Sequence, residues 1–198
     1  MASKKNMKSI LYKISKSPKV QKQVQKKIND KVQAFKQGVL DQFDSHPVTR
    51  EISAGENAVN VSNSLGGYGN LFSFIGFASS SNPTLPLRQV IDASIKLKLW
   101  KTIPKGKRVQ FKFLINTPSE DAIHSATPMP WESGSWVRGV EEGMSNFGFY
   151  MYKKFQSGRS GMGLQSDHEL RKAIFSPQKY VSEILENFKE QVRMMKIK

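Results

Sequence analysis

The sequence has no cysteine among its 198 residues. This absence excludes disulfide bonds, thiolate nucleophiles and Cys-based zinc sites together. No run approaches the roughly 20 apolar residues that a membrane-spanning helix needs, and the lysine-rich start lacks the apolar stretch and cleavage site of a secretory signal. With 38% hydrophobic residues, the chain is typical of one folded domain of ordinary size.

Positive charge is concentrated at the start of the chain. Residues 1–40 hold eleven lysines, no arginine and a single acid, Asp30, for a net charge of +10. The whole chain carries +15, so the other 158 residues carry +5. We therefore expect a basic N-terminal arm, residues 1–17, on an otherwise ordinary domain, residues 18–198. Because base edges are typically read by Arg, Asn or Gln, the arginine-free arm predicts at most sequence-independent contact with nucleic acid.

A long amphipathic helix is predicted over residues 18–44. Ser17 and Pro18 supply a cap and a proline at the first helical position, and Pro47 biases His46 away from helix. Apolar residues then recur every three or four positions: Val20, Val24, Ile28, Val32, Phe35, Val39 and Phe43. Basic residues opposite such a stripe also suit a membrane surface, but a Val/Ile stripe suits protein packing at least as well, and we expect no membrane partner.

The rest of the sequence predicts an α+β fold, with an antiparallel sheet flanked by the long N-terminal helix and a C-terminal helix. Alternating residues on either side of Pro104 predict a hairpin over residues 95–115. Further strands are expected at 59–61, 71–77, 136–140 and 147–155, a short helix at 84–92 and a loop at 117–135. Ser176 and Pro177 are expected to start the C-terminal helix, whose apolar stripe runs from Tyr180 to Met195.

No catalytic or cofactor motif is recognisable. His46, His124 and His168 are too far apart to form a local metal site, and each is interpreted as a surface or loop residue rather than as part of a hydrolase. The glycine-rich segments at 66–69 and 158–163 lack the pattern of a phosphate-binding loop. We therefore expect a non-enzymatic protein without cofactor or metal, whose loops carry recognition.

Four strings resemble proteins from the structural genes of large tailed bacteriophages: FDSHPVTREI (43–52), LGGYGNLFSFIGF (65–77), PMPWESGSWV (128–137) and SGRSG (157–161). The resemblance covers about residues 42–165 and is to neck and tail-completion proteins, which form rings between the portal and the tail. It implies a structural virion protein, assembled in the host cytoplasm, in a homo-oligomeric ring around the path of double-stranded DNA. Its partners would be the portal or adaptor ring and tail terminator proteins.

Two groups of candidate contact residues follow from this resemblance and from the sequence pattern. Interfaces favour aromatic and aliphatic anchors, so the expected ring contacts are Val20, Val24, Ile28, Val32, Phe35, Tyr68, Phe72, Trp131 and Trp136. The expected contacts with DNA or an acidic partner are Lys4, Lys5, Lys8, Lys13, Lys16, Lys22, Lys26 and Lys27. The alternative is a basic accessory protein that binds nucleic acid without sequence specificity through its lysine arm.

Overall fold

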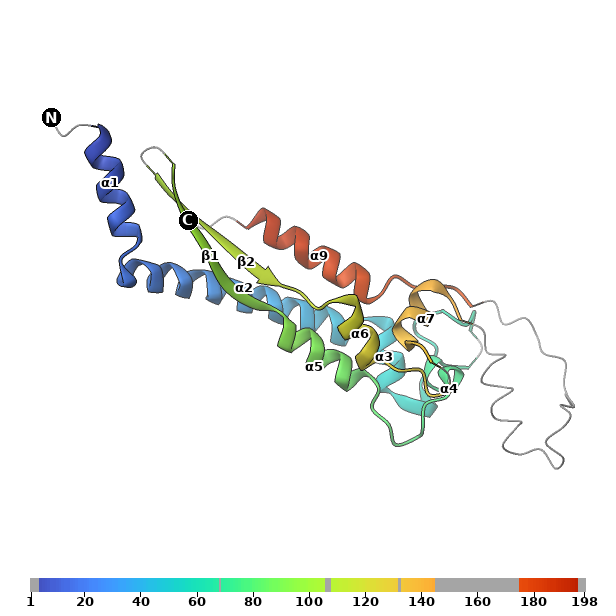
Figure 1. The fold of residues 1–198 in the computed structure, drawn as a ribbon. Coiled ribbons are helices and arrows are strands. Elements are labelled where there is room, and N and C mark those ends of the chain that lie inside the picture. Colours follow the sequence, from blue (N-terminus) through green and yellow to red (C-terminus); the bar gives the residue numbers. More distant parts are fainter. Residues whose placement is uncertain (1–3, 68, 106–107, 132, 145–174, 196–198) are drawn as a thin grey trace, which may run out of the picture.

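The computed structural model describes residues 4–67, 69–105, 108–131, 133–144 and 175–195. Figure 1 shows an elongated molecule in which a long helix, α2, lies along the body. A short helix, α1, lies at one end, and the small helices α3, α4 and α7 gather at the other. The expected α+β class, with a long N-terminal helix and a C-terminal helix around an antiparallel sheet, is confirmed.

The arm and the long helix are two consecutive helices. α1 spans Lys4–Ser15 and α2 spans Pro18–Ser45, 28 residues that extend about 42 Å. The predicted limits of α2 are confirmed, with Pro18 in its first turn and His46 in extended backbone after its end. The side chain of Ser17 makes no capping hydrogen bond, so proline rather than the serine hydroxyl favours the start of this helix.

The middle of the chain departs from the predicted strands. After α3 (Pro47–Ser53) and the 3-10 helix η1 (Gly55–Asn57), residues 59–61 form no strand. Leu71–Ile75 form the helix α4, because Asn70 Oδ1 accepts a hydrogen bond from Ser73 N at 2.9 Å and Gly76 ends the turn with φ 85°. The short helix expected at 84–92 is confirmed as α5, Thr84–Ser94.

The predicted hairpin is present as strands β1 (Lys96–Lys105) and β2 (Arg108–Asn116), paired antiparallel. These two strands form the one sheet of the described residues. Leu97, Phe113 and Ile115 are partly buried and pack against the core. The apolar face expected from the alternation is therefore confirmed.

Capping residues also correct the prediction after the hairpin. The expected loop at 117–135 contains the helix α6 (Glu120–Ala126), whose cap Ser119 accepts from Ala122 N. The expected strand at 136–140 is the helix α7 (Trp136–Glu142), capped by Ser135. The C-terminal helix α9 spans Val181–Met194 and starts four residues after Pro177. The expected strand at 147–155 lies outside the described residues.

The core lies between α2 and α9 and continues to the end formed by α3, α4 and α7. The stripe of α9 is buried there as predicted, at Tyr180, Val181, Ile184, Leu185 and Phe188. Tyr180 is fully buried and packs against the rings of Phe43, His46 and Trp136, with centroid distances of 5.9, 4.8 and 6.2 Å. Its hydroxyl forms a 2.6 Å hydrogen bond with Thr49 Oγ1. This aromatic junction joins α2, α3, α7 and α9.

Candidate interaction surface

Two basic segments meet at one end of the molecule. The first is residues 1–40, with a net charge of +10. The second is the hairpin, because residues 96–116 hold six lysines, Arg108 and no acid, for a net of +7. α1 lies against both strands, and α2 lies against β1. All remaining residues together carry a net charge of −2, so the chain's positive charge is the property of this basic end, defined here as residues 4–40 with the hairpin.

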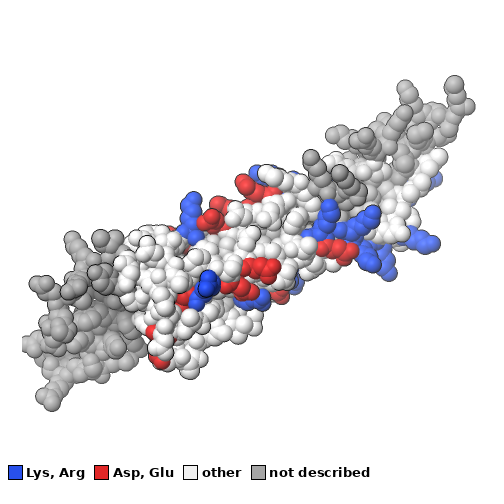
Figure 2. Space-filling model, turned by 180° about the vertical axis from the view of Figure 1, so that it is seen from behind, with Lys and Arg blue, Asp and Glu red and all other residues white. Residues whose placement is uncertain are grey.

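The basic end extends the expectation that the positive charge belongs mainly to the N-terminal arm, because the hairpin is also basic. Figure 2 shows lysine and arginine side chains predominating toward this end, on the right in that view, whereas acidic and basic side chains are interspersed over the middle of the molecule. The positive charge of the hairpin was not singled out from the sequence, because a net charge of +5 averaged over 158 residues is ordinary. The informative feature was the run of 21 residues without an acid.

The structure describes the side chains of five of the eight lysines predicted to contact DNA or an acidic partner. These five, Lys13, Lys16, Lys22, Lys26 and Lys27, are all exposed. Lys16 Nζ lies 4.7 Å from the centroid of the Tyr12 ring, a cation–π contact. The side chains of Lys4, Lys5 and Lys8 lie outside the described part of the structure, although their backbone belongs to α1.

The predicted ring contacts are divided by burial. Ile28 and Val32 are fully buried, and Phe72 and Trp136 are 2% and 1% exposed. These four side chains belong to the chain's own core and cannot also meet a second copy while this fold persists, so their assignment as ring contacts is corrected. An apolar stripe cannot reveal whether its partner is the same chain or another.

The other predicted ring contacts retain some accessible surface. Val20, Val24 and Phe35 on α2 and Trp131 are partly exposed. The indole N–H of Trp131 donates to the carbonyl of Ile75 at 2.8 Å, which fixes the ring beside α4. Tyr68 lies outside the described residues.

His46 is a helix cap inside the aromatic junction rather than a free surface residue. Its Nδ1 accepts from Val48 N at 3.3 Å, and its ring packs against Tyr180. Burial lowers the pKa of His46 below its usual 6.5, although a backbone hydrogen bond at Lys179 acts in the opposite direction. A neutral imidazole that accepts a backbone N–H fits this site. Burial also raises the pKa of Tyr180, which keeps its hydroxyl protonated.

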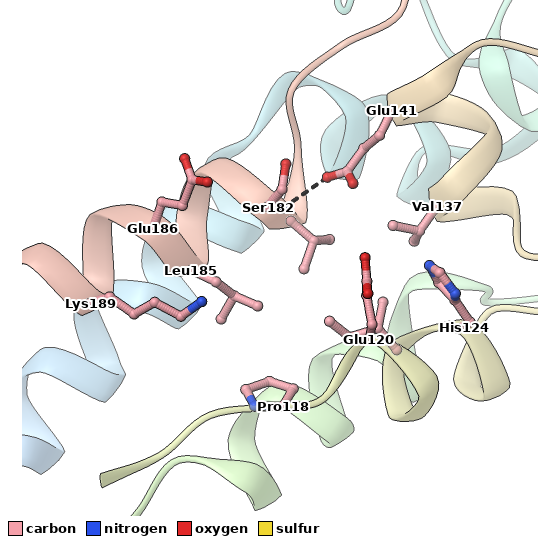
Figure 3. Close-up of a pocket in the computed structure, with 11 residues that line it drawn as sticks. Pro118, Glu120, His124, Val137, Glu141, Ser182, Leu185, Glu186 and Lys189 are labelled. Atoms are coloured by element: carbon pink, nitrogen blue, oxygen red, sulfur yellow. Dashed lines mark hydrogen bonds between the residues drawn. The ribbon is translucent and has the colours of Figure 1, made fainter.

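His124 lines a cavity of about 290 Å³ between α6, α7 and α9. Figure 3 shows Glu120 and His124 beside it on α6 and Lys189 on α9, and Glu186 of α9 also contributes to its lining. Glu141 Oε1 accepts from the backbone N–H groups of Tyr180 and Ser182, at 3.3 and 2.8 Å, so this carboxylate holds the start of α9. The cavity is thus lined by groups with a structural role and by solvated charges.

Neither this cavity nor the rest of the described chain assembles a metal site. Within those residues, no group of three or more His, Asp or Glu is placed to hold a metal ion. Also within them, no helix has both the length and the apolar character needed to cross a membrane. His168, the third histidine considered, lies outside the described residues.

Comparison with known proteins identifies no relative for the chain. It matches no protein-family model, no curated protein and no solved structure. The resemblance to phage neck proteins therefore stays a hypothesis.

Proposed function

We propose that the protein is a non-enzymatic assembly subunit that joins copies of itself head to tail into a ring, as in the neck of a tailed bacteriophage. The observation that carries the proposal is the position of exposed aliphatic side chains at both ends of an elongated subunit. On α1, Ile10 and Ile14 are 54% and 51% exposed. In the loop that joins η1 to α4, Val59 and Val61 are 77% and 47% exposed.

These two patches lie at opposite ends of the molecule. α1 is at one end, whereas α4, which contacts η1, is at the other (Figure 1). A closed ring uses heterologous contacts, in which one patch of each subunit meets a different patch of the next. Two separate patches are what such a contact requires. In the neck, the partners would be the portal or adaptor ring and tail terminator proteins, and the lumen would contain double-stranded DNA.

Mixing two interface variants tests the head-to-tail arrangement. The full chain should form rings in mass photometry and negative-stain images, alone or with its portal partner. Ile10→Asp with Ile14→Asp should abolish rings, as should Val59→Asp with Val61→Asp. Each double variant keeps one intact patch, so a mixture of the two should stop at a heterodimer.

A matched control uses Leu85, which is 46% exposed on α5 and lies in neither patch. Leu85→Asp should leave the rings intact. A chain that stays monomeric at all concentrations and with its partners contradicts the proposal, and so does a mixture that restores full rings.

The second candidate is a nucleic-acid-binding accessory protein, favoured by the +10 charge of residues 1–40. A monomer whose affinity for DNA falls steeply with salt and is lost when the exposed Lys13, Lys16, Lys22, Lys26 and Lys27 are replaced by Gln would support this candidate over the ring.

A further inference from the structure

The two faces of the hairpin differ in chemistry, and the strand register shows how. Cross-strand partners in an antiparallel pair lie on the same face of the ribbon. Leu97 lies opposite Ile115 on the face that packs against the core. Lys96 lies opposite Asn116, and Lys98 opposite Leu114, on the other face, where all four residues are exposed.

An irregularity in β1 keeps a third lysine on that exposed face. Strict two-residue alternation would place Lys101 on the core face with Leu97. The register shifts between Leu99 and Lys101, so Trp100 has no partner and Lys101 lies opposite Lys112. A bulge of this kind re-aims the residues that follow it. Lys101 is consequently exposed on the face of Lys96 and Lys98.

The result is a cationic ribbon face, defined here by Lys96, Lys98, Lys101 and Lys112. All four side chains are exposed, and the strands contain no acid. Lysines two residues apart on a strand are separated by about 7 Å, so the charges form a row rather than a pocket for one small anion. Lys101 and Lys112 are direct cross-strand partners, and like charges in such positions cost stability.

A row of cations is complementary to a chain of phosphates. Duplex DNA carries one negative charge per roughly 1.7 Å of its axis, and each contacted phosphate releases a counterion. A two-stranded ribbon also has the dimensions that the major groove admits. All four cations that define this face are lysines. The flexible, point-like charge of lysine suits contact with phosphate better than bidentate hydrogen bonding to base edges.

We propose that the cationic ribbon face binds the phosphate backbone of double-stranded DNA without sequence specificity. The inference rests on the proposed function only for the choice of duplex DNA as the polyanion. It adds the hairpin as a binding element and assigns a role to the bulge, which places Lys101 in the row.

The test measures how the affinity of the full chain for a short mixed-sequence DNA duplex depends on salt, by fluorescence anisotropy. The variant is Lys96→Gln with Lys98→Gln and Lys101→Gln. If these three lysines contact phosphates, the slope of log K against log salt should fall by about 2.7. The advantage of the native chain over this variant should then grow about 40-fold as salt falls from 200 to 50 mM.

A charge-matched control separates a local surface from net charge. Arg50→Gln with Arg138→Gln and Lys179→Gln removes the same three charges from exposed positions outside the basic end. This control should keep the native slope, and both variants should melt at about the native temperature. If the two triple variants weaken binding equally, or if the native chain binds vesicles of phosphatidylserine and phosphatidylcholine but not the duplex, the inference is overturned.

The two proposals fail separately. Rings whose DNA affinity does not respond to the hairpin variant contradict the ribbon face alone. A chain that shows the expected change of slope but never forms rings contradicts the ring subunit alone.

Discussion

The aromatic junction and the basic end treat polar groups in opposite ways. At the junction, the buried groups satisfy one another: Tyr180 bonds Thr49, His46 caps α3, and Glu141 holds the start of α9. At the basic end, by contrast, most described lysine side chains are exposed to solvent. The hairpin contains no acidic residue, and residues 1–40 contain one. The junction is therefore stabilised by contacts within the chain, whereas the basic end presents exposed lysines, although Lys36 pairs with Asp92 at 2.7 Å.

The largest expected effect separates the two tryptophans that the sequence grouped as contacts. Trp136 is buried and packs edge-on against Phe77, with centroids 5.9 Å apart. Trp136→Ala should lower the free energy of unfolding by about 3–5 kcal/mol, because it leaves a cavity in the core. Urea denaturation measures this loss. Trp131→Phe, which removes one hydrogen bond at a half-buried ring, should cost about 1 kcal/mol. Similar losses for both variants would contradict this division.

A smaller loss is expected at Glu51, the buried carboxylate beside the junction. It is 1% exposed and accepts from Ser62 N at 2.8 Å and Leu71 N at 2.7 Å. Glu51→Ala leaves two buried N–H groups without these partners and should cost about 2–3 kcal/mol. Glu190→Ala, at an exposed position of α9, should change stability by no more than about 0.5 kcal/mol. A loss at Glu51 no larger than at Glu190 would show that the carboxylate does not hold the loop.

The junction should also respond to pH through His46. Its pKa is lowered in the folded chain, so below about pH 6.5 the unfolded chain binds more protons than the folded one. The contribution of His46 to the free energy of unfolding therefore has its full value above that pH and is lost as the pH falls toward the pKa of His46 in the folded chain. Urea midpoints between about pH 7 and 5.5 measure this decline. His46→Asn keeps a capping oxygen but does not titrate, so an equal decline in that variant would assign the effect to other groups.

The smallest effect tests the basic end, where the expected sign is reversed. The hairpin variant at Lys96, Lys98 and Lys101 relieves repulsion between like charges. At low salt its free energy of unfolding should equal that of the native chain or exceed it by up to about 0.5 kcal/mol. The same urea titrations measure it. A loss of more than about 1 kcal/mol would show that these lysines stabilise the fold and would remove the contrast with the junction.

Local patterns predicted the two long helices, the helix α5 and the hairpin, but not the shorter helices α3, α4, α6 and α7. The 28-residue α2 and the stripe of α9 show helical periodicity over several turns, and alternation marks both strands. In α4, by contrast, five residues are too few for periodicity to separate helix from strand. Its capping residues, Asn70 and Gly76, were the better indication, as Ser135 was for α7.

Only part of the candidate surface was predicted from the sequence. The lysines of the arm follow from counting charges, and so would the acid-free hairpin if it were counted by itself. The sequence does not predict that Ile28, Val32, Phe72 and Trp136 are buried within the subunit. An apolar side chain indicates only that it avoids water, and not whether its own chain or a second copy covers it.

By itself, the amino-acid sequence determined the helical and strand periods, the excess of lysine and the lack of cysteine, since each depends on residues close together in the chain. Only the tertiary structure decided that the hairpin joins the arm in one basic end, and that the bulge keeps Lys101 on the exposed face. The physical reason is that the first outcome depends on packing between segments far apart in the chain and the second on the register of the two strands, neither of which is encoded by local pattern.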